Sequence, residues 1–343
     1  MIFIDNLWYI LYNYILKICK TVYNSIVVNK SGVNILKKLN CIFGPIPSRR
    51  LGRSLGISPI PKKVCNYSCI YCQLGRTTQM TNTRKEFFPV DDIISELSEY
   101  LKYTDDFDVI SIVGEGEPTL YLNLDLLIEK IKLLTNKPIA IITNGALLSD
   151  LYVQNALSKA DIVLPSIDGY NEEIYKKVDR PYGTLKFNDE IDGLIEFAKK
   201  FKGEIWLEIM LMKGINSSKK DIDEFAKLIE KIPHDRVYIN TPVRPPAENF
   251  VEVATSDEIN YAVEKLNGIS IDKLTSGSFF SEIPDSYDAI LNLIKRHPMT
   301  QFEIQSLLAS RREENIDSFF TKLANDNNVN SINYKGIITY RLK

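Results

Sequence analysis

The chain has 343 residues, enough for one large domain and a smaller one, and its 45% hydrophobic and 25% charged content is typical of a globular protein. A disulfide framework is excluded, because three of the five cysteines fall within residues 65–72 and the other two stand apart. The net charge is -2, yet no Asp or Glu lies between Asp5 and Glu86, where thirteen Lys and Arg occur. This basic stretch indicates either an anionic partner such as RNA or attraction to the acidic remainder of the fold.

Residues 1–43 are predicted to form a helical extension ahead of the main domain. The segment Ile2–Val28 is apolar and aromatic, but charged residues limit its longest uncharged run to about eleven residues, whereas a membrane-spanning helix needs about twenty. The positive charge and the cleavage site of a secretory signal are both missing from their usual places. We therefore expect a cytoplasmic protein without a stable membrane span. The extension is then an amphipathic docking helix or the product of a misplaced start codon.

From Leu51 onward, short β-branched runs alternate with helical stretches, which is the pattern of a parallel βα architecture. Strands are predicted near Leu55 and at Val109–Val113, Ile139–Thr143, Ile162–Ser166, Ile205–Leu211 and Val237–Asn240. Helices are predicted at Val90–Leu101, Leu124–Leu134, Leu151–Lys159, Phe187–Phe201 and Asp221–Ile232. Six βα units are too few for a closed eight-stranded barrel. We therefore predict an α/β fold with a partial (βα)6 barrel over residues 44–250, whose open side another part of the chain must cover.

The pattern changes after Asn240. A Pro-rich turn at 241–246, a helix near 257–266 and an irregular stretch near 276–284 predict a bridge over residues 251–284. Three helices and two strands follow, with Thr300 as the N-cap of the second helix. They are predicted at Ser286–Lys295, Gln301–Ala309, Glu314–Asn325, Val329–Asn333 and Ile337–Leu342. These elements predict a small winged-helix-like domain over residues 285–343.

The cysteines of residues 65–72 read Cys65-Asn-Tyr-Ser-Cys69-Ile-Tyr-Cys72, on one loop after the first predicted strand of the barrel. Three thiolates on a four-iron cubane leave one iron with an open coordination position. The amino and carboxylate groups of S-adenosylmethionine (SAM) can chelate that iron, so that one electron breaks a carbon-sulfur bond and releases a 5'-deoxyadenosyl radical. Structural zinc is the alternative, but it uses four ligands, usually as two spaced pairs, and no second pair is present. Cys19 and Cys41 are interpreted as small apolar side chains.

The CxxxCxxC spacing, with the aromatic Tyr71 before its last cysteine, resembles the signature of the radical SAM superfamily. The resemblance covers about residues 44–246. It implies a partial barrel, one [4Fe-4S] cluster on Cys65, Cys69 and Cys72, SAM as a second cofactor, and a low-potential electron donor such as ferredoxin or flavodoxin.

Further motifs follow in the order that this resemblance implies. The segment Glu115-Gly116-Glu117-Pro118 resembles the family's GGEP segment, which binds the amino group of the cofactor, with Glu115 in place of the first glycine. Thr143 and Asn144 end one strand, and Ser166 and Asp168 follow the next. The resemblance implies that these strand ends face the cofactor, with Ser166 or Asp168 holding its ribose hydroxyls. Ser and Asp are also ordinary turn formers.

Two further stretches, residues 44–52 and 241–248, resemble an uncharacterised archaeal and bacterial branch that is similar to the tRNA wyosine-base synthetases. Those enzymes hold a second cluster on three additional cysteines ahead of the radical motif. This chain has only Cys19 and Cys41 there, so a second cluster of that kind cannot form.

The substrate is less defined. Arg49, Arg50, Arg53 and Arg244 are candidate contacts, because guanidinium groups bind phosphates bidentately and a basic patch attracts nucleic acid. Salt bridges within the protein are the competing interpretation. The third helix of the predicted winged helix is mainly acidic, a poor match to a phosphate-lined groove.

Three functional hypotheses follow from these features. The first is a radical SAM enzyme acting on RNA, tRNA or a nucleotide-like anion. The second keeps this chemistry and takes a peptide or a small metabolite as substrate. The third is an iron-sulfur sensor that regulates transcription through the winged helix, against which the cofactor-binding segment argues.

Overall fold

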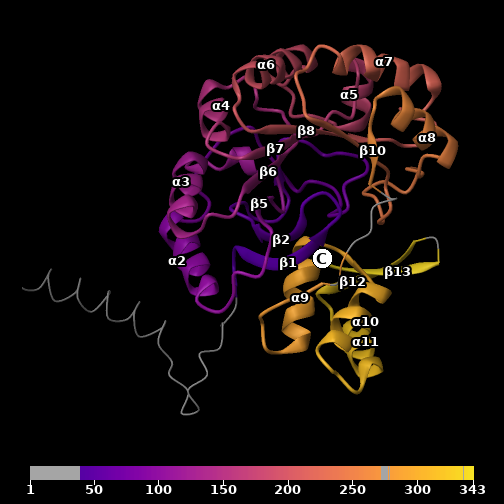
Figure 1. Ribbon diagram of the computed structural model, residues 1–343. Helices are drawn as coiled ribbons and strands as arrows, with labels where there is room; N and C mark the ends of the chain where they lie inside the picture. The colour runs from indigo at the N-terminus through magenta and orange to yellow at the C-terminus, as the bar shows by residue number, and fades with distance from the viewer. Residues whose placement is uncertain (1–38, 272–276, 278, 335) are drawn as a thin grey trace, which may run out of the picture. The chain divides into compact units, whose positions relative to one another are not determined.

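The computed structural model describes residues 39–271, 277, 279–334 and 336–343; most of the predicted N-terminal extension, including Cys19, lies outside them. Its centre is an eight-stranded sheet in the order β1-β2-β5-β6-β7-β8-β9-β10 (Figure 1). Strand β1 runs antiparallel to β2, and every other neighbouring pair is parallel. The strands are β1 (Ile42–Ser48), β2 (Gly52–Ile57), β5 (Val109–Ile112), β6 (Ile139–Thr143), β7 (Ile162–Pro165), β8 (Glu204–Met210), β9 (Arg236–Asn240) and β10 (Ile269–Ser270). This open order of largely parallel strands is that of a partial barrel.

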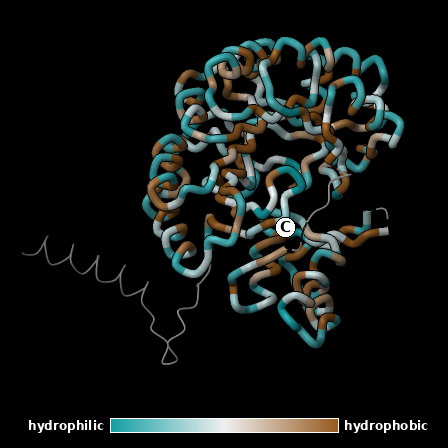
Figure 2. Tube along the Cα trace, in the orientation of Figure 1, coloured by the Kyte–Doolittle hydropathy of each residue, from teal (hydrophilic) through white to brown (hydrophobic). Residues whose placement is uncertain are grey.

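Helices between these strands cover the outer face of the sheet (Figure 1). They are α2 (Val90–Leu101), α3 (Leu124–Leu134), α4 (Leu151–Leu157), α5 (Glu172–Val178), α6 (Phe187–Lys200), α7 (Lys219–Ile229) and α8 (Ser256–Lys265). Each helix packs on the sheet through an apolar face, as α2 illustrates. Its buried residues recur at helical spacing along one face: Val90, Ile93, Leu97 and Tyr100. Figure 2 shows the same alternation of hydrophobic and hydrophilic residues along the surrounding helices. In the part of the chain that the structure describes, no helix is both long and apolar enough to cross a membrane.

The six predicted parallel strands are all present, but two additional strands extend the sheet. Strand β1 contains Gly44, Pro45 and Pro47, residues that are rare inside strands, but an end strand tolerates proline because one of its edges needs no partner. Strand β10 has only two residues, too few to show a period, and lies inside the predicted bridge. The sheet therefore continues past residue 250.

The last 59 residues, 285–343, are called the C-terminal module below. It contains α9 (Ser286–Arg296), α10 (Gln301–Ser310) and α11 (Ile316–Asn325), with a small sheet in the order β11-β13-β12. Its strands are β11 (Met299–Thr300), β12 (Val329–Tyr334) and β13 (Ile337–Leu342). The predicted N-cap is confirmed, because the Thr300 side chain accepts from the backbone N–H of Glu303 in a capping box. The winged-helix interpretation of this module stays a prediction.

The C-terminal module packs against the first strand of the sheet and against the segment that follows β9. Phe43 and Ile46 of β1 share one hydrophobic cluster with Ile290 and Leu293 of α9. Beyond β9, the Arg244 guanidinium donates to the carbonyl oxygen of Pro298 at 2.7 Å and to Glu303 at 2.8 Å. The module thus covers the side that a partial barrel leaves open.

Candidate active site

A cavity of about 430 Å³ lies at the carboxyl ends of the parallel strands, where catalytic residues of βα barrels gather. It brings together the three motif cysteines, the Gly-rich turn after β5, the ends of β6 to β9 and part of the C-terminal module. Among its lining residues are Cys65, Cys69, Tyr71, Cys72, Glu115, Gly116, Glu117, Thr143, Asn144, Ser166, Glu208, Met210, Asn240, Phe279, Arg296, His297 and Glu303. A second hollow of about 490 Å³ contains none of the cysteines. The cavity with the cysteines is therefore the candidate active site.

The cysteine loop, residues 65–72, begins at the short strand β3 (Val64–Cys65). Its three thiols are half-buried and free of disulfides. Two N–H groups point at the Cys65 sulfur: the Tyr67 amide at 3.4 Å and the Asn144 side chain at 3.8 Å. Hydrogen bonds of this kind are typical around iron-sulfur clusters and tune their potential. Burial raises the pKa of all three thiols, so they keep their protons until a cation binds.

The loop supplies three free thiols to the cavity. A structural zinc ion uses four protein ligands, whereas a [4Fe-4S] cluster held by three thiolates keeps one iron open for a small molecule. The number of thiols therefore favours a cluster over a structural zinc ion.

Glu117 organises the strand ends beside this loop. Its buried carboxylate accepts from the Thr119 backbone N–H at 2.9 Å, the Thr119 hydroxyl at 2.6 Å, the Thr143 hydroxyl at 2.6 Å and the Asn144 backbone N–H at 2.8 Å. Burial raises the pKa of Glu117, and these four donors oppose that effect. Pro118, the next residue, begins the short 3₁₀ helix η1 (Pro118–Leu120), is itself buried and does not line the cavity. Glu117 thus joins the turn after β5 to the end of β6.

Gly116 allows this turn to approach the cysteine loop. A Cβ atom at Gly116 would lie 1.7 Å from the Val64 carbonyl oxygen, which accepts from the Glu117 N–H at 3.1 Å. We expect Gly116→Ala to lower the free energy of unfolding by about 1–3 kcal/mol, because backbone must move to relieve the overlap. It should also displace Glu117 and weaken SAM binding. Urea denaturation and equilibrium dialysis of SAM measure the two effects.

Gly183→Ala is the matched control, because no atom lies within 4 Å of a Cβ built at Gly183 and its φ is not positive. This substitution should change the free energy of unfolding by well under 1 kcal/mol and leave SAM binding intact. Equal behaviour of the two variants would contradict the tight approach at Gly116.

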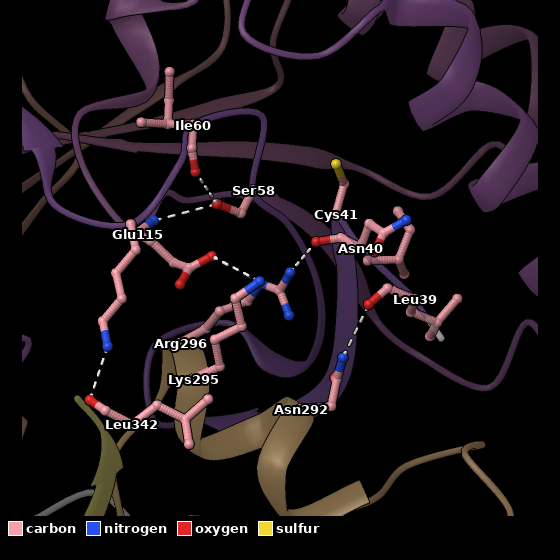
Figure 3. Close-up of polar contacts among 12 residues, drawn as sticks. Leu39, Asn40, Cys41, Ser58, Ile60, Glu115, Asn292, Lys295, Arg296 and Leu342 are labelled. Carbon is pink, nitrogen blue, oxygen red and sulfur yellow. Dashed lines mark hydrogen bonds and ion pairs between the residues drawn. The ribbon is translucent and has the colours of Figure 1, made fainter. Parts of the chain in front are cut away.

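The carboxylate of Glu115 meets the C-terminal module (Figure 3). Its Oε2 atom lies 3.5 Å from Nε of Arg296 and 3.8 Å from Nζ of Lys295, both on α9. The Glu115 N–H donates to the Ser58 hydroxyl at 3.2 Å, and Arg296 also donates to the carbonyl oxygen of Asn40. The resemblance implied a cofactor contact for Glu115. In the structure Glu115 lines the cavity and its carboxylate also connects the turn after β5 to α9, so the cofactor contact stays a prediction.

The two residues expected at the cofactor ribose differ in position. Ser166 lines the cavity, whereas Asp168 is 3% exposed and does not. The Asp168 carboxylate accepts from the Tyr71 hydroxyl and from the Met210 N–H, the latter at 2.7 Å. These partners occupy Asp168, so it positions Tyr71 beside Cys72 and does not face the cavity. Ser166 follows β7 and lines the cavity, and its contact with the cofactor ribose stays a prediction.

The four candidate arginines also separate. Arg49, Arg50 and Arg244 line the cavity, and Arg50 is ion-paired with Glu208 inside it. Arg53 lies elsewhere, at the amino end of β2, where its half-exposed guanidinium pairs with Asp106 and with Asp108 at 3.2 Å. The prediction of a substrate contact for Arg53 is therefore corrected. Arg49 and Arg53 are only four positions apart in the sequence, yet Arg49 lines the cavity and Arg53 lies outside it.

Sequence reasoning missed the contribution of His297 and Phe279 to the cavity wall. The two rings pack with centroids 5.3 Å apart. Neither residue belongs to a motif, and both are more than 200 positions from the cysteine loop in the sequence. No sequence signal could have placed them there.

A comparison with known proteins identifies the domain that contains the cysteine loop. A family model described as the Radical SAM superfamily matches residues 60–229, which include the cysteine loop and Glu117. The chain belongs to this superfamily, and it is therefore an enzyme that uses a [4Fe-4S] cluster and SAM.

Within the superfamily, the chain belongs to the UPF0026 family. A UPF0026 protein of Methanocaldococcus jannaschii is 33% identical over 309 residues, covering 87% of this chain and 94% of that protein. A Brachyspira hyodysenteriae protein named GTPase Obg is 34% identical over 320 residues, 92% of this chain and 47% of that protein, so this chain spans about half its length. A structure titled TYW1 with a lysine-pyruvate adduct bound shares 20% identity and a TM-score of 0.46, covering 68% of this chain and 79% of that one.

Proposed function

We propose that Cys65, Cys69 and Cys72 hold the [4Fe-4S] cluster and that SAM binds beside it in the cavity. When bound, the cluster supplies the electron that cleaves SAM into methionine and a 5'-deoxyadenosyl radical. The observation that carries the proposal is the convergence of three free thiols with the strand ends that Glu117 organises, all on one cavity. A low-potential donor of the ferredoxin or flavodoxin type would deliver the electron in the cytoplasm.

The chain's own residues orient the cofactor in this proposal. Thr143 and Asn144 present the end of β6 to the cavity, and Glu117 fixes both through its hydrogen bonds. Ser166 at the end of β7 is the candidate for a ribose hydroxyl. Tyr71, held by Asp168, provides an apolar wall next to Cys72 and helps to exclude water from the cluster. Gly116 leaves room for the backbone of the turn to approach the ligand.

For the substrate we propose an anionic compound, nucleotide-like or part of an RNA such as tRNA. Arg49, Arg50 and Arg244 line the cavity, and among them Arg49 has no carboxylate partner in the described residues, whereas Glu208 pairs with Arg50 and Glu303 with Arg244. Guanidinium is the side-chain group best suited to phosphate or carboxylate. Membership of an enzyme superfamily leaves the transcription-sensor hypothesis without support.

Anaerobic SAM cleavage tests the proposal. The protein is reconstituted with iron and sulfide, supplied with SAM and dithionite, and assayed for 5'-deoxyadenosine and methionine by liquid chromatography. We expect the two products in equal amounts, and neither without dithionite, because cleavage needs an electron. If a fully assembled cluster gives no product and its electron paramagnetic resonance spectrum does not change on adding SAM, the proposal is wrong.

A further inference from the structure

Arg49 and His297 face the candidate active site from opposite parts of the fold. Arg49 lies in the turn between β1 and β2, and His297 directly follows α9 of the C-terminal module. Both are half-buried and both line the cavity. Within residues 39–271, 277, 279–334 and 336–343, neither side chain has a hydrogen-bond or ion-pair partner. Their N–H donors are therefore available to a molecule in the cavity.

The neighbouring arginines are already neutralised. Arg50 is paired with Glu208, and Arg244 donates to the Pro298 carbonyl and to Glu303. Burial lowers the pKa of His297 well below its usual value, and the charges of Arg244, Arg49 and Arg50 lower it further. The imidazole is thus neutral, and all four groups line the same cavity. Arg49 therefore brings to the cavity a positive charge that no carboxylate among the described residues neutralises.

His297 is held in place from three sides. Its backbone N–H donates to the Leu293 carbonyl at 2.8 Å, and its ring packs on Phe279. The residues before and after it are anchored as well, Arg296 by Glu115 and Asn40, and Pro298 by Arg244. A donor fixed in this way binds a ligand with little loss of side-chain entropy.

We propose that Arg49 and His297 form an oxyanion subsite that binds a carboxylate or phosphate group of the substrate. The Arg49 guanidinium supplies two parallel N–H donors and the net positive charge, and the His297 imidazole supplies a third donor. The C-terminal module then completes the substrate site as well as covering the barrel. This inference rests on the proposed function, since it assigns the subsite to the substrate of the same cavity.

Anion binding to the reconstituted, SAM-saturated protein tests the subsite. Inorganic phosphate and acetate are titrated in parallel by isothermal titration calorimetry, and the preferred anion identifies the chemistry of the group. We expect Arg49→Gln to weaken binding of the preferred anion about tenfold or more, because charge-assisted hydrogen bonds are the strong ones. His297→Ala should weaken it less, and His297→Asn should restore part of the loss because it retains an N–H donor.

Arg53→Gln is the matched control, since Arg53 undergoes the same change outside the cavity. It should bind the anion like the wild type. Equal affinity of the wild type and Arg49→Gln, or absence of binding by the wild type, would overturn the subsite. Binding that occurs only without SAM would also overturn it, by assigning the groups to the carboxylate of the cofactor.

The 5'-deoxyadenosine assay on the same preparations separates the two proposals. Anion binding with no SAM cleavage would contradict the proposed function and leave the subsite standing. SAM cleavage with no anion binding would contradict the subsite and leave the proposed function standing. Circular dichroism spectra of all variants show whether each is folded.

Discussion

Cys69→Ala is expected to abolish 5'-deoxyadenosine formation under conditions in which the wild type forms it. Cys69 lies between the other two cysteines of the loop, and all three thiols line the cavity. Removing one leaves two protein ligands for a cluster that already has one iron without a protein ligand. The variant should contain much less iron after reconstitution, and its product should fall below detection. Iron analysis, the visible absorption spectrum and the product assay measure these losses.

Cys41→Ala is the control for the loss of a buried thiol. Cys41 is 3% exposed and does not line the cavity. Burial raises the pKa of its thiol to about 12, so the side chain is uncharged, which agrees with its interpretation as a small apolar residue. Its replacement removes one buried atom and should cost roughly 1 kcal/mol of stability, with cluster content and product yield unchanged. Loss of the cluster from Cys41→Ala, or its retention in Cys69→Ala, would show that the ligand set differs from the one proposed.

Glu115→Gln is expected to lower the free energy of unfolding by about 3 kcal/mol. The side chains of Glu115 and Arg296 are 4% and 2% exposed, so the substitution leaves the Arg296 charge buried without its carboxylate. Breaking a buried ion pair in this way costs about 3–5 kcal/mol. We take the lower end, because Arg296 keeps the Asn40 carbonyl and the atoms of the ion pair are 3.5 Å apart. Urea denaturation of the wild type and the variant measures the difference.

Glu129→Gln provides the comparison with an exposed ion pair. Glu129 pairs with Lys159 on the surface, its side chain 54% exposed, and its replacement should change stability by less than about 1 kcal/mol. SAM affinity distinguishes the two roles of Glu115, which are anchoring α9 through Arg296 and contacting the cofactor. A large loss of SAM affinity without a loss of stability would restore the cofactor contact that the resemblance implied and would exclude the anchoring role.

Local pattern was enough to predict most of the barrel. Helices α2 and α3 were predicted with their observed bounds, and β6 likewise, because amphipathic spacing and β-branched runs are properties of contiguous residues. Strands β1 and β10 were not predicted, because neither has a local strand pattern. Strand β1 contains two prolines, and β10 has only two residues. Their pairing depends on neighbours that are distant in the sequence.

By itself, the sequence determined the chemistry of this protein. Three cysteines at CxxxCxxC spacing and the turn containing Gly116 and Glu117 are contiguous segments, so their spacing already specifies which atoms can hold a cluster and approach a cofactor. The tertiary structure decided which other residues share that cavity. It turned Glu115 toward α9, occupied Asp168 with Tyr71, placed Arg53 outside the cavity and put His297 and Arg49, 248 positions apart in the sequence, on the same cavity. Such placements follow from the packing of segments that are distant in the sequence, within the barrel and between the barrel and the C-terminal module, which no local pattern encodes.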